Sequence, residues 1–308
     1  MKGKRMAAIV LSLATVMALT PVASAFSDIK GLKGEKHILQ LKERGVIKGD
    51  AKGKGAYHPQ DKLSYAQAAV MLDEAFELSL AHILFVKEPK ASDVYTKVKD
   101  NTWYSQAFVD GYHNGLIFDK DINPNAPISR EEFAAQLMKQ VDRLGDYALI
   151  KMYVGYTDED KGKDEYKGEI QKLLLLKFAE LNKDGSFNPT KPITREDAAI
   201  WVSNALKFVE EQFGDKEEEQ GDKQVALSEL TFKTEKINDD VNKVTVSATV
   251  PHPGYGMNIS EISFEGDVAI IKLTQVDPNP DMMYPQVIST VTADTYISSQ
   301  YKIKLIAE

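Results

Sequence analysis

Three stretches of the sequence repeat one pattern: "LSYAQAAVML" at residues 63–72, "ISREEFAAQLM" at residues 128–138 and "ITREDAAIWVS" at residues 193–203. Each begins with a residue pair that ends in Ser or Thr and continues with apolar residues at steps of three and four, which predicts a capped amphipathic helix. Shared positions on these helices alternate between small and large apolar residues along one stripe. They are Ala69, Ala134, Ala199, then Leu72, Leu137, Val202, then Phe76, Val141, Leu206. Since one such unit could not bury its apolar face alone, the pattern predicts three helical repeats packed around a shared axis.

Two further anchors recur ahead of each stretch at the same interval. They are an aspartate, at Asp28, Asp93 and Asp158, and a proline, at Pro59, Pro124 and Pro189. Between these anchors each copy contains an amphipathic segment, "HILQLKERGVI", "SQAFVDGYHNGLI" or "EIQKLLLLKFAEL", followed by a Gly-, Asp- and Asn-rich loop. We therefore expect helix–loop–helix units at residues 26–85, 91–145 and 156–209.

These units resemble S-layer homology (SLH) repeats, the cell-wall-anchoring modules of Gram-positive surface proteins. The resemblance covers about residues 26–210 and is carried by "FSDI", "GVIKGD", the Tyr/Phe-x-Pro element and "ITRED" with its counterpart "ISREE". It implies a pseudo-threefold bundle of three SLH repeats. The grooves between its repeats would bind a secondary cell-wall polysaccharide, often one bearing a pyruvate ketal.

Two arginines are the main candidates for binding such a glycan. Arg130 and Arg195 each follow an N-cap, where backbone N–H groups lack helical acceptors and the helix dipole is positive. An arginine fork beside such amides would make a compact receptor for a carboxylate. The alternative is an intramolecular ion pair, with Glu131, Glu196 or an aspartate of the turns.

Three further side chains complete the predicted glycan site, and the first copy departs from it. Ser129 and Thr194 either cap their helices or face the sugar, and capping is the favoured reading. Trp103 offers a flat face for a sugar ring, but it could equally be a wedge in the core. Because the first copy has Tyr65 in place of arginine, we expect that copy to be mainly scaffold, or to bind by stacking and hydrogen bonds alone.

The first 25 residues have the pattern of a secretory signal peptide. Basic Lys2, Lys4 and Arg5 precede an apolar run, and Ala23-Ser24-Ala25 is a small-x-small cleavage signal. Neither a disulfide nor a lipidated N-terminal cysteine is available, since the chain has no Cys. The net charge of −8 makes nucleic acid or an anionic membrane a poor partner. We expect a secreted protein held non-covalently at the cell wall or S-layer of a Gram-positive-type bacterium, with no membrane span after cleavage.

The last third of the chain changes character. Residues 210–224 are dense in charge and predict a linker or a frayed helix end. From residue 225 to 308, period-two runs such as "KVTVSATV" predict four to six strands of a small antiparallel β domain, with a hairpin at Gly266-Asp267. Within it, "PGYGMNISEI" and "DVAIIKLTQVDPNPDMMYPQV" are similar to the C-terminal domain of protease-complex-associated (PrcB-like) proteins. That resemblance implies association with an extracellular protease.

Enzyme chemistry has little support in the sequence. The five His residues lack metal-ligand spacing and lie in no triad motif, and "LNKDGSFNP" lacks the downstream glutamate of a calcium loop. We expect no catalytic residue, no metal and no cofactor. The preferred hypothesis is a multidomain α + β protein that anchors to an anionic glycan and displays its β domain to a partner. The alternatives are a regulator or inhibitor of an extracellular protease, and a structural lattice subunit.

Overall fold

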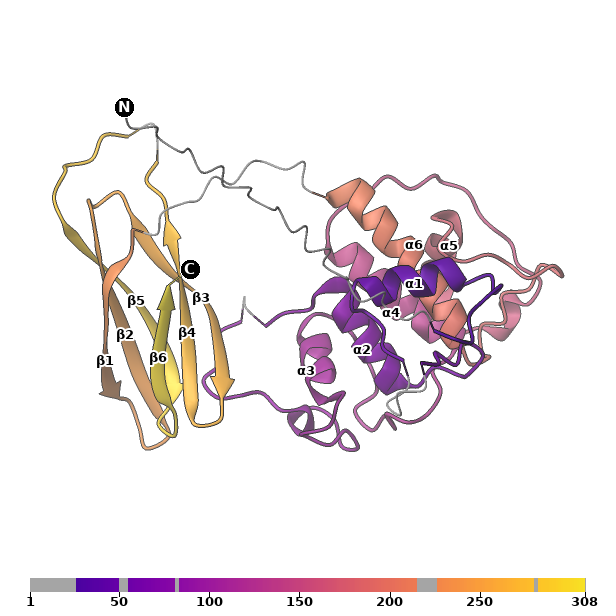
Figure 1. Ribbon diagram of the computed structural model, residues 1–308, viewed down its shortest axis with the longest axis horizontal. Coiled ribbons are helices and arrows are strands. Elements are labelled where there is room, and N and C mark those ends of the chain that lie inside the picture. The colour runs from indigo at the N-terminus through magenta and orange to yellow at the C-terminus, as the bar shows by residue number, and fades with distance from the viewer. Residues whose placement is uncertain (1–25, 50–54, 81–82, 215–225, 280–281, 308) are drawn as a thin grey trace, which may run out of the picture.

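The computed structural model describes residues 26–49, 55–80, 83–214, 226–279 and 282–307 (Figure 1). The α-helices lie between residues 35 and 213, and the β-strands lie between residues 228 and 307. The α + β class expected from the sequence is therefore confirmed. The predicted signal peptide, residues 1–25, lies outside the described residues.

The helical region alternates between shorter and longer helices. The shorter ones are α1 (Glu35–Glu43), α3 (Ser105–His113) and α5 (Lys167–Leu175), and the longer ones are α2 (Tyr65–Phe76), α4 (Arg130–Arg143) and α6 (Arg195–Phe213). One 3₁₀ turn, η1 (Ala91–Asp93), precedes α3. Two more, η2 (Glu159–Lys161) and η3 (Asp164–Tyr166), precede α5. Each long helix begins where the repeated motif begins.

The packing order of these helices is cyclic. The long helices α2, α4 and α6 contact one another. Each short helix packs on the long helix of the preceding copy, α3 on α2 and α5 on α4, while α1 packs on α6 and so joins the first copy to the last. The space beside each long helix is therefore bordered by residues from different copies.

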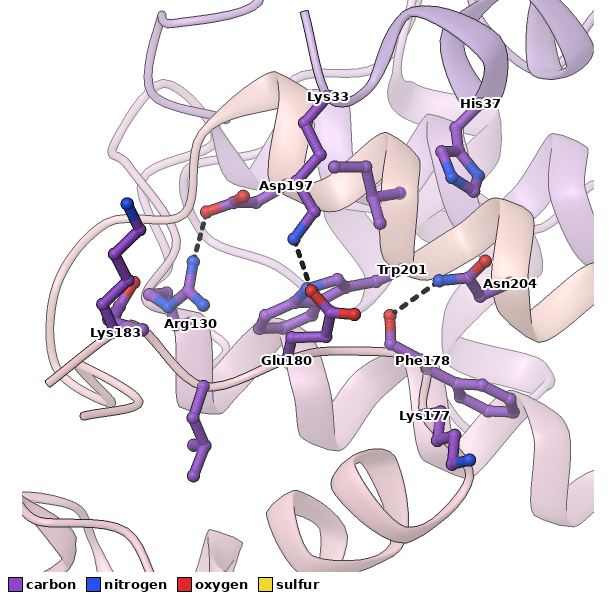
Figure 2. Close-up of a pocket in the computed structure, with 13 residues that line it drawn as sticks. Lys33, His37, Arg130, Lys177, Phe178, Glu180, Lys183, Asp197, Trp201 and Asn204 are labelled. Atoms are coloured by element: carbon purple, nitrogen blue, oxygen red, sulfur yellow. Dashed lines mark hydrogen bonds and ion pairs between the residues drawn. The ribbon is translucent and has the colours of Figure 1, made fainter. Parts of the chain in front are cut away.

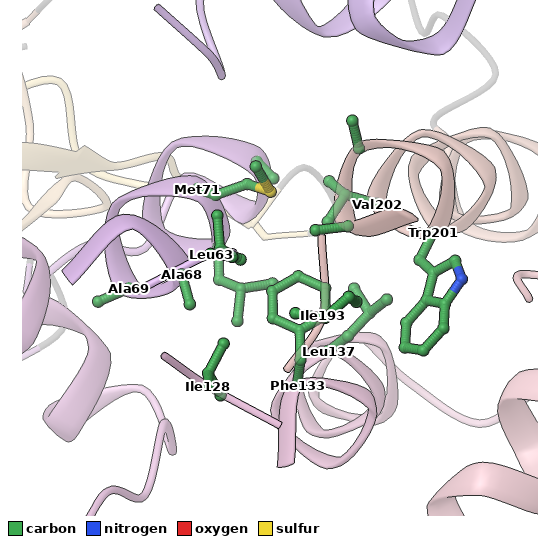
Figure 3. Packing of buried hydrophobic residues seen from close by; sticks show 14 of the residues in the cluster. Leu63, Ala68, Ala69, Met71, Ile128, Phe133, Leu137, Ile193, Trp201 and Val202 are labelled. Atoms are coloured by element: carbon green, nitrogen blue, oxygen red, sulfur yellow. The ribbon is translucent and has the colours of Figure 1, made fainter. Parts of the chain in front are cut away.

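A closed ring of backbone hydrogen bonds joins the three motif segments just before the long helices. The N–H of Leu63 donates to the carbonyl of Ile193 (2.9 Å), that of Ile193 to Ile128 (3.1 Å), and that of Ile128 to Leu63 (3.0 Å). All three side chains are fully buried and meet at the centre of the apolar cluster (Figure 3). The ring satisfies peptide groups that could not reach water, and it fixes where the three helices start.

The apolar stripe predicted on the long helices forms the core around this ring. Leu72, Leu137 and Val202 are fully buried, and the small Ala69, like its counterparts in the other copies, lies in the same cluster (Figure 3). Truncation of a buried leucine of this kind costs about 2–5 kcal/mol, because it leaves a cavity that the packed neighbours do not fill.

The β-strands form two three-stranded sheets around a second core. The sheets have the orders β1-β2-β5 and β3-β4-β6. The strands are β1 (Ser228–Lys236), β2 (Val241–Val250), β3 (Gly256–Glu265), β4 (Val268–Val276), β5 (Ser289–Ser298) and β6 (Lys302–Ala307). Inward-facing residues such as Val246, Ile271 and Ile297 are buried between the sheets, as the period-two pattern predicted.

The purely antiparallel β domain expected from the sequence is wrong in one pair. β4 and β6 run parallel, with Val268 opposite Lys302. The reason is that β5, which follows β4, joins the other sheet beside β2. The chain then crosses back, and β6 lies beside β4 with the same direction. The hairpin predicted at Gly266-Asp267 is confirmed. It joins β3 to β4, and Gly266 has a positive φ of 60°.

Residues 210–213, at the start of the segment predicted to be a linker or a frayed helix end, are the last residues of α6. Helix α6 continues to Phe213, because this residue and Phe208 pack their rings against Tyr147. Residues 215–225, the rest of the predicted linker, lie outside the described part of the chain.

Candidate functional site

The amides at the start of α4 and α6 are already occupied by protein acceptors. In α4 the N–H of Arg130 donates to Lys191 O (2.9 Å) and that of Glu131 to Pro189 O (3.0 Å). In α6 the N–H of Arg195 donates to Asp61 O in the same way (2.9 Å). The expectation that these amides would receive a carboxylate ligand is therefore wrong. Each helix start lies against the loop that precedes the next long helix, and the loop carbonyls take the place of a ligand.

Ser129 and Thr194 cap their helices. The Ser129 hydroxyl accepts from the N–H of Glu132 (3.2 Å), and the Glu132 carboxylate accepts from the N–H of Ser129 (3.3 Å), which completes a capping box. Thr194 accepts from the N–H of Asp197 (3.1 Å) without a box, as expected from the shorter aspartate. The favoured capping role is thus observed, while a sugar contact from either hydroxyl stays a prediction.

Arg130 is buried and held on three sides. Its Nε donates to Phe187 O (2.8 Å), and its Nη1 forms an ion pair with Asp197, the third residue of α6. The guanidinium lies 4.8 Å from the ring centre of Trp201 and 5.2 Å from that of Phe187. Burial lowers the pKa of Arg130, and Asp197 opposes that effect. The guanidinium therefore occupies a fixed position, with Asp197 half-exposed beside it.

The ion pair of Arg130 involves a carboxylate that the sequence did not indicate. The candidates Glu131, Glu196 and Asp158 bind backbone amides instead. Glu131 accepts from the N–H of Lys163 (2.9 Å), and Glu196 accepts from the N–H of Gly34 (2.8 Å). Asp158 accepts from the N–H groups of residues 187 and 188. The two glutamates of the motif thus fasten α4 and α6 to the segments ahead of α5 and α1, each from another copy.

Arg195 is less committed than Arg130. It is half-buried, its Nε donates to Tyr57 O (2.9 Å), and its guanidinium lies 4.4 Å from the centre of the Tyr57 ring. Within the described ranges no carboxylate forms an ion pair with it. The charge of Arg195 is therefore balanced by no protein anion described here.

Tyr65 takes the structural place of the arginines in the first copy. Its hydroxyl donates to the carboxylate of Glu132 (2.7 Å). Glu132 is the third residue of α4, as Asp197 is the third residue of α6. Burial, followed by the hydrogen bond to Glu132, raises the pKa of Tyr65 above its usual value. The tyrosine thus makes the contact between long helices without contributing a positive charge.

Arg130 opens onto a cavity of about 630 Å³, called here the Arg130 groove (Figure 2). It lies between α6, the start of α1 and the segment after α5. Its lining residues are Lys33, His37, Arg130, Lys177, Phe178, Glu180, Leu181, Asn182, Lys183, Asp197, Ile200, Trp201 and Asn204. Four cations face two carboxylates, so the groove has a positive excess in a chain whose net charge is −8. Lys33 and Glu180 form an exposed ion pair across it (2.6 Å).

Trp103 does not belong to the Arg130 groove. Its side chain is 66% exposed, so the core-wedge reading is wrong. It precedes α3 by two residues, as Lys33 precedes α1, and Lys33 lines the Arg130 groove. Because α3 packs on α2 as α1 packs on α6, Trp103 has the corresponding place beside α2.

Phe178 and Trp201 also line the Arg130 groove, and the sequence analysis did not single them out. Both are buried, and Trp201 contacts Arg130. The corresponding residues of Trp201 in the other copies are Met71 and Gln136, so the repeat carried no signal for it.

Comparison with known protein families finds a match in the first and third of the expected units. The S-layer homology domain matches residues 25–69 and 155–199. These two segments are similar to S-layer homology domains. These findings indicate a location at the bacterial cell surface. In the described ranges no helix is long and apolar enough to cross a membrane, and no cluster of three or more metal-binding side chains occurs.

Two curated proteins are similar to this chain over about two thirds of its length. The Surface-layer 125 kDa protein of Lysinibacillus sphaericus is 28% identical over 221 residues, which is 68% of this chain and 17% of that protein. An Endoglucanase of Bacillus sp. (strain KSM-635) is 27% identical over 220 residues, which is 66% of this chain and 22% of that enzyme. The chain thus spans about a fifth of the length of these relatives.

Proposed function

We propose that this protein anchors itself non-covalently to an anionic secondary cell-wall polysaccharide, such as a pyruvylated one, through three SLH repeats in a pseudo-threefold bundle. Residues 91–145 would be the second repeat, between the two matched regions. The closed ring of Leu63, Ile128 and Ile193 supports this, because each copy contributes the same position to it. The cyclic packing of the six helices gives the same support.

The Arg130 groove is the observation that carries the proposal. It combines a fixed guanidinium, packed on the buried indole of Trp201, with further lysines, in a protein whose overall charge would repel an anion. Carboxylates are bound by arginine forks, so the groove suits an acidic sugar. To bind a carboxylate, Arg130 would share its donors with Asp197.

Arg195 is proposed as a second binding position. Its guanidinium has no anionic partner in the described residues, and the exposed Trp103 holds the place beside α2 that Lys33 holds beside α6. Ser129 and Thr194 would contribute indirectly, by fixing the helix starts from which the arginines project. Tyr65, without a charge, would serve mainly as scaffold.

The experiment is cosedimentation of the secreted chain with purified cell-wall sacculi. Sacculi that retain their polysaccharide should carry the protein into the pellet, and sacculi stripped of that polymer should leave it in solution. Equal sedimentation with both preparations would refute glycan anchoring.

We further propose that the β domain associates with a partner such as an extracellular protease, and that the chain itself catalyses no reaction. The support is an apolar tip near β5: Met283 is 99% exposed and Ile288 is 78% exposed. The loop that bears them is held in place by Tyr284, whose ring stacks on His252 (5.5 Å between centres). Exposed, methionine-rich apolar surface is typical of binding sites.

Capture from culture supernatant with the full chain as bait tests this second proposal. Recovery of a protease that is lost when Met283 and Ile288 are both changed to Ser would support it. Recovery of the protein itself would favour a lattice subunit instead. Inhibition of a captured protease would distinguish a regulator from a passive partner.

A further inference from the structure

Lys177 has a left-handed backbone conformation, and the corresponding residues of the other two copies are glycines. It lies two residues after the end of α5, as Gly45 does after α1 and Gly115 after α3. The φ angles are 59° for Lys177, 77° for Gly45 and 88° for Gly115. Left-handed backbone of this kind is unstrained for glycine and unfavourable for lysine. The third copy therefore accepts a cost that the other two avoid.

Nothing in the packing of the protein explains the lysine. A Cβ atom built on Gly45 or Gly115 would meet no other atom within 4 Å, so this position faces open space. Lys177 is exposed, and in the described part of the chain it forms no ion pair. A strained residue without a structural contact suggests a role in binding.

The position of Lys177 gives that role a place. Lys177 and Lys183 are the first and last residues of the segment that lines one side of the Arg130 groove, and Figure 2 shows them at opposite ends of it. Neither forms an ion pair within the described ranges, whereas Arg130 pairs with Asp197 and Lys33 pairs with Glu180. The two uncommitted cations thus bracket the groove.

We propose that Lys177 and Lys183 bind anionic groups on separate sugar units of a linear glycan that lies along the Arg130 groove. This inference rests on the proposed anchoring function and specifies its ligand class. A single acidic sugar at Arg130 could not occupy both ends of the groove at once. The ligand is therefore a chain with repeated charges, and binding at the ends depends on salt because both lysines are exposed.

The decisive variant is Lys177→Gly, which removes the charge and also relieves the backbone. It should melt about 2–4 °C higher than the parent, since glycine suits the left-handed conformation in a domain of this size. It should nevertheless bind sacculi about two- to fivefold more weakly, as expected for the loss of one exposed ion pair. Lys183→Gln should show the same loss of binding, and Lys177→Arg should retain the affinity of the parent.

The control is Lys151→Gln, which removes an exposed cation outside the groove. It should leave binding unchanged, which separates a local contact from a general change in charge. The affinities are measured with full-length protein at several salt concentrations, beside a thermal melt of each variant.

Three outcomes would overturn the inference. They are a Lys177→Gly variant that binds as well as the parent or better, one that is no more stable than the parent, and an equal loss of binding in Lys151→Gln. If the parent itself does not bind sacculi, the proposed function fails. If the parent binds and Lys177→Gly binds equally well, only this inference fails.

Discussion

Two carboxyl groups face each other where α2 packs on α3, and they predict an unusual pH dependence. Asp73 has a buried Oδ1 that no hydrogen-bond donor reaches in the described residues, and Asp110 accepts from Gln106 Nε2 (2.9 Å). Burial, then the charges of Asp110 and Glu74, raises the pKa of Asp73 to about 7. Burial raises the pKa of Asp110 to about 6, against the opposing hydrogen bond from Gln106.

Both folded pKa values lie above the value of about 3.9 for an unfolded aspartate. The two groups therefore favour the folded state fully below pH 4, and this contribution is lost as the pH rises through 6 and 7. For Asp110 the difference between the folded and unfolded pKa corresponds to about 3 kcal/mol, which screening by solvent reduces to about 2 kcal/mol. Above pH 7 both groups ionise inside the helix interface and destabilise it.

Asp110→Asn tests this reasoning. The variant keeps an acceptor for Gln106 and removes one of the two charges, so at pH 8 it should be about 2 kcal/mol more stable than the parent. At pH 4 the two should be nearly equal, and the difference should grow as the pH rises from 4 to about 6. Urea unfolding followed by tryptophan fluorescence is suitable, because both Trp residues of the chain, Trp103 and Trp201, lie in the helical region.

Asp121→Asn is the matched control, since its side chain is exposed on a loop. It should shift stability by less than about 0.5 kcal/mol at every pH. A difference between Asp110→Asn and the parent that stays constant from pH 4 to pH 8 would contradict the argument.

Three further predictions concern individual contacts. Ser129→Ala removes the N-cap of α4 and should lower the free energy of unfolding by about 1 kcal/mol in urea titrations, and an unchanged value would argue against the cap. Tyr65→Phe removes the hydrogen bond to Glu132 and should cost about 1 kcal/mol of stability while sacculus binding stays the same, whereas a loss of binding would make Tyr65 a ligand contact. Gly254→Ala places a Cβ 2.7 Å from the Tyr284 ring, so it should displace the apolar tip and reduce partner capture, and normal capture would show that the tip is not the contact surface.

The local features of the fold could be predicted from the sequence because they depend on neighbouring residues. The N-caps at Ser64, Ser129 and Thr194 lie within three residues of the amides they satisfy, and the turn at Gly266 depends on one positive φ angle. The period-two pattern likewise located the strands. It could not order them, since the parallel pairing of β4 with β6 depends on which sheet β5 joins.

The candidate site could be predicted only in part, because its contacts depend on the cyclic packing of the copies. Arg130 was found from its repeated position, but its partner Asp197 lies 67 residues away on the next long helix. The same packing brings the carbonyls of Pro189 and Lys191 to the helix start, which removed the amides from the predicted receptor. Trp201 is part of the core, and its contact with Arg130 could not be foreseen because it too depends on the packing of one copy against the next.

The central claim is that the motif arginines bind an anionic wall glycan, and a sacculus-binding isotherm tests it most directly. The full-length parent is compared with Arg130→Gln, Arg195→Gln and the double variant, each with a thermal melt. A charge-assisted contact of about 1.5–3 kcal/mol predicts roughly ten- to hundredfold weaker binding for each single variant and almost none for the double variant. Arg195→Gln should keep a near-parental melt, because its arginine has no carboxylate partner in the described residues. Parental affinity in both single variants, or losses that only follow unfolding, would show that the arginines are structural and contradict the account.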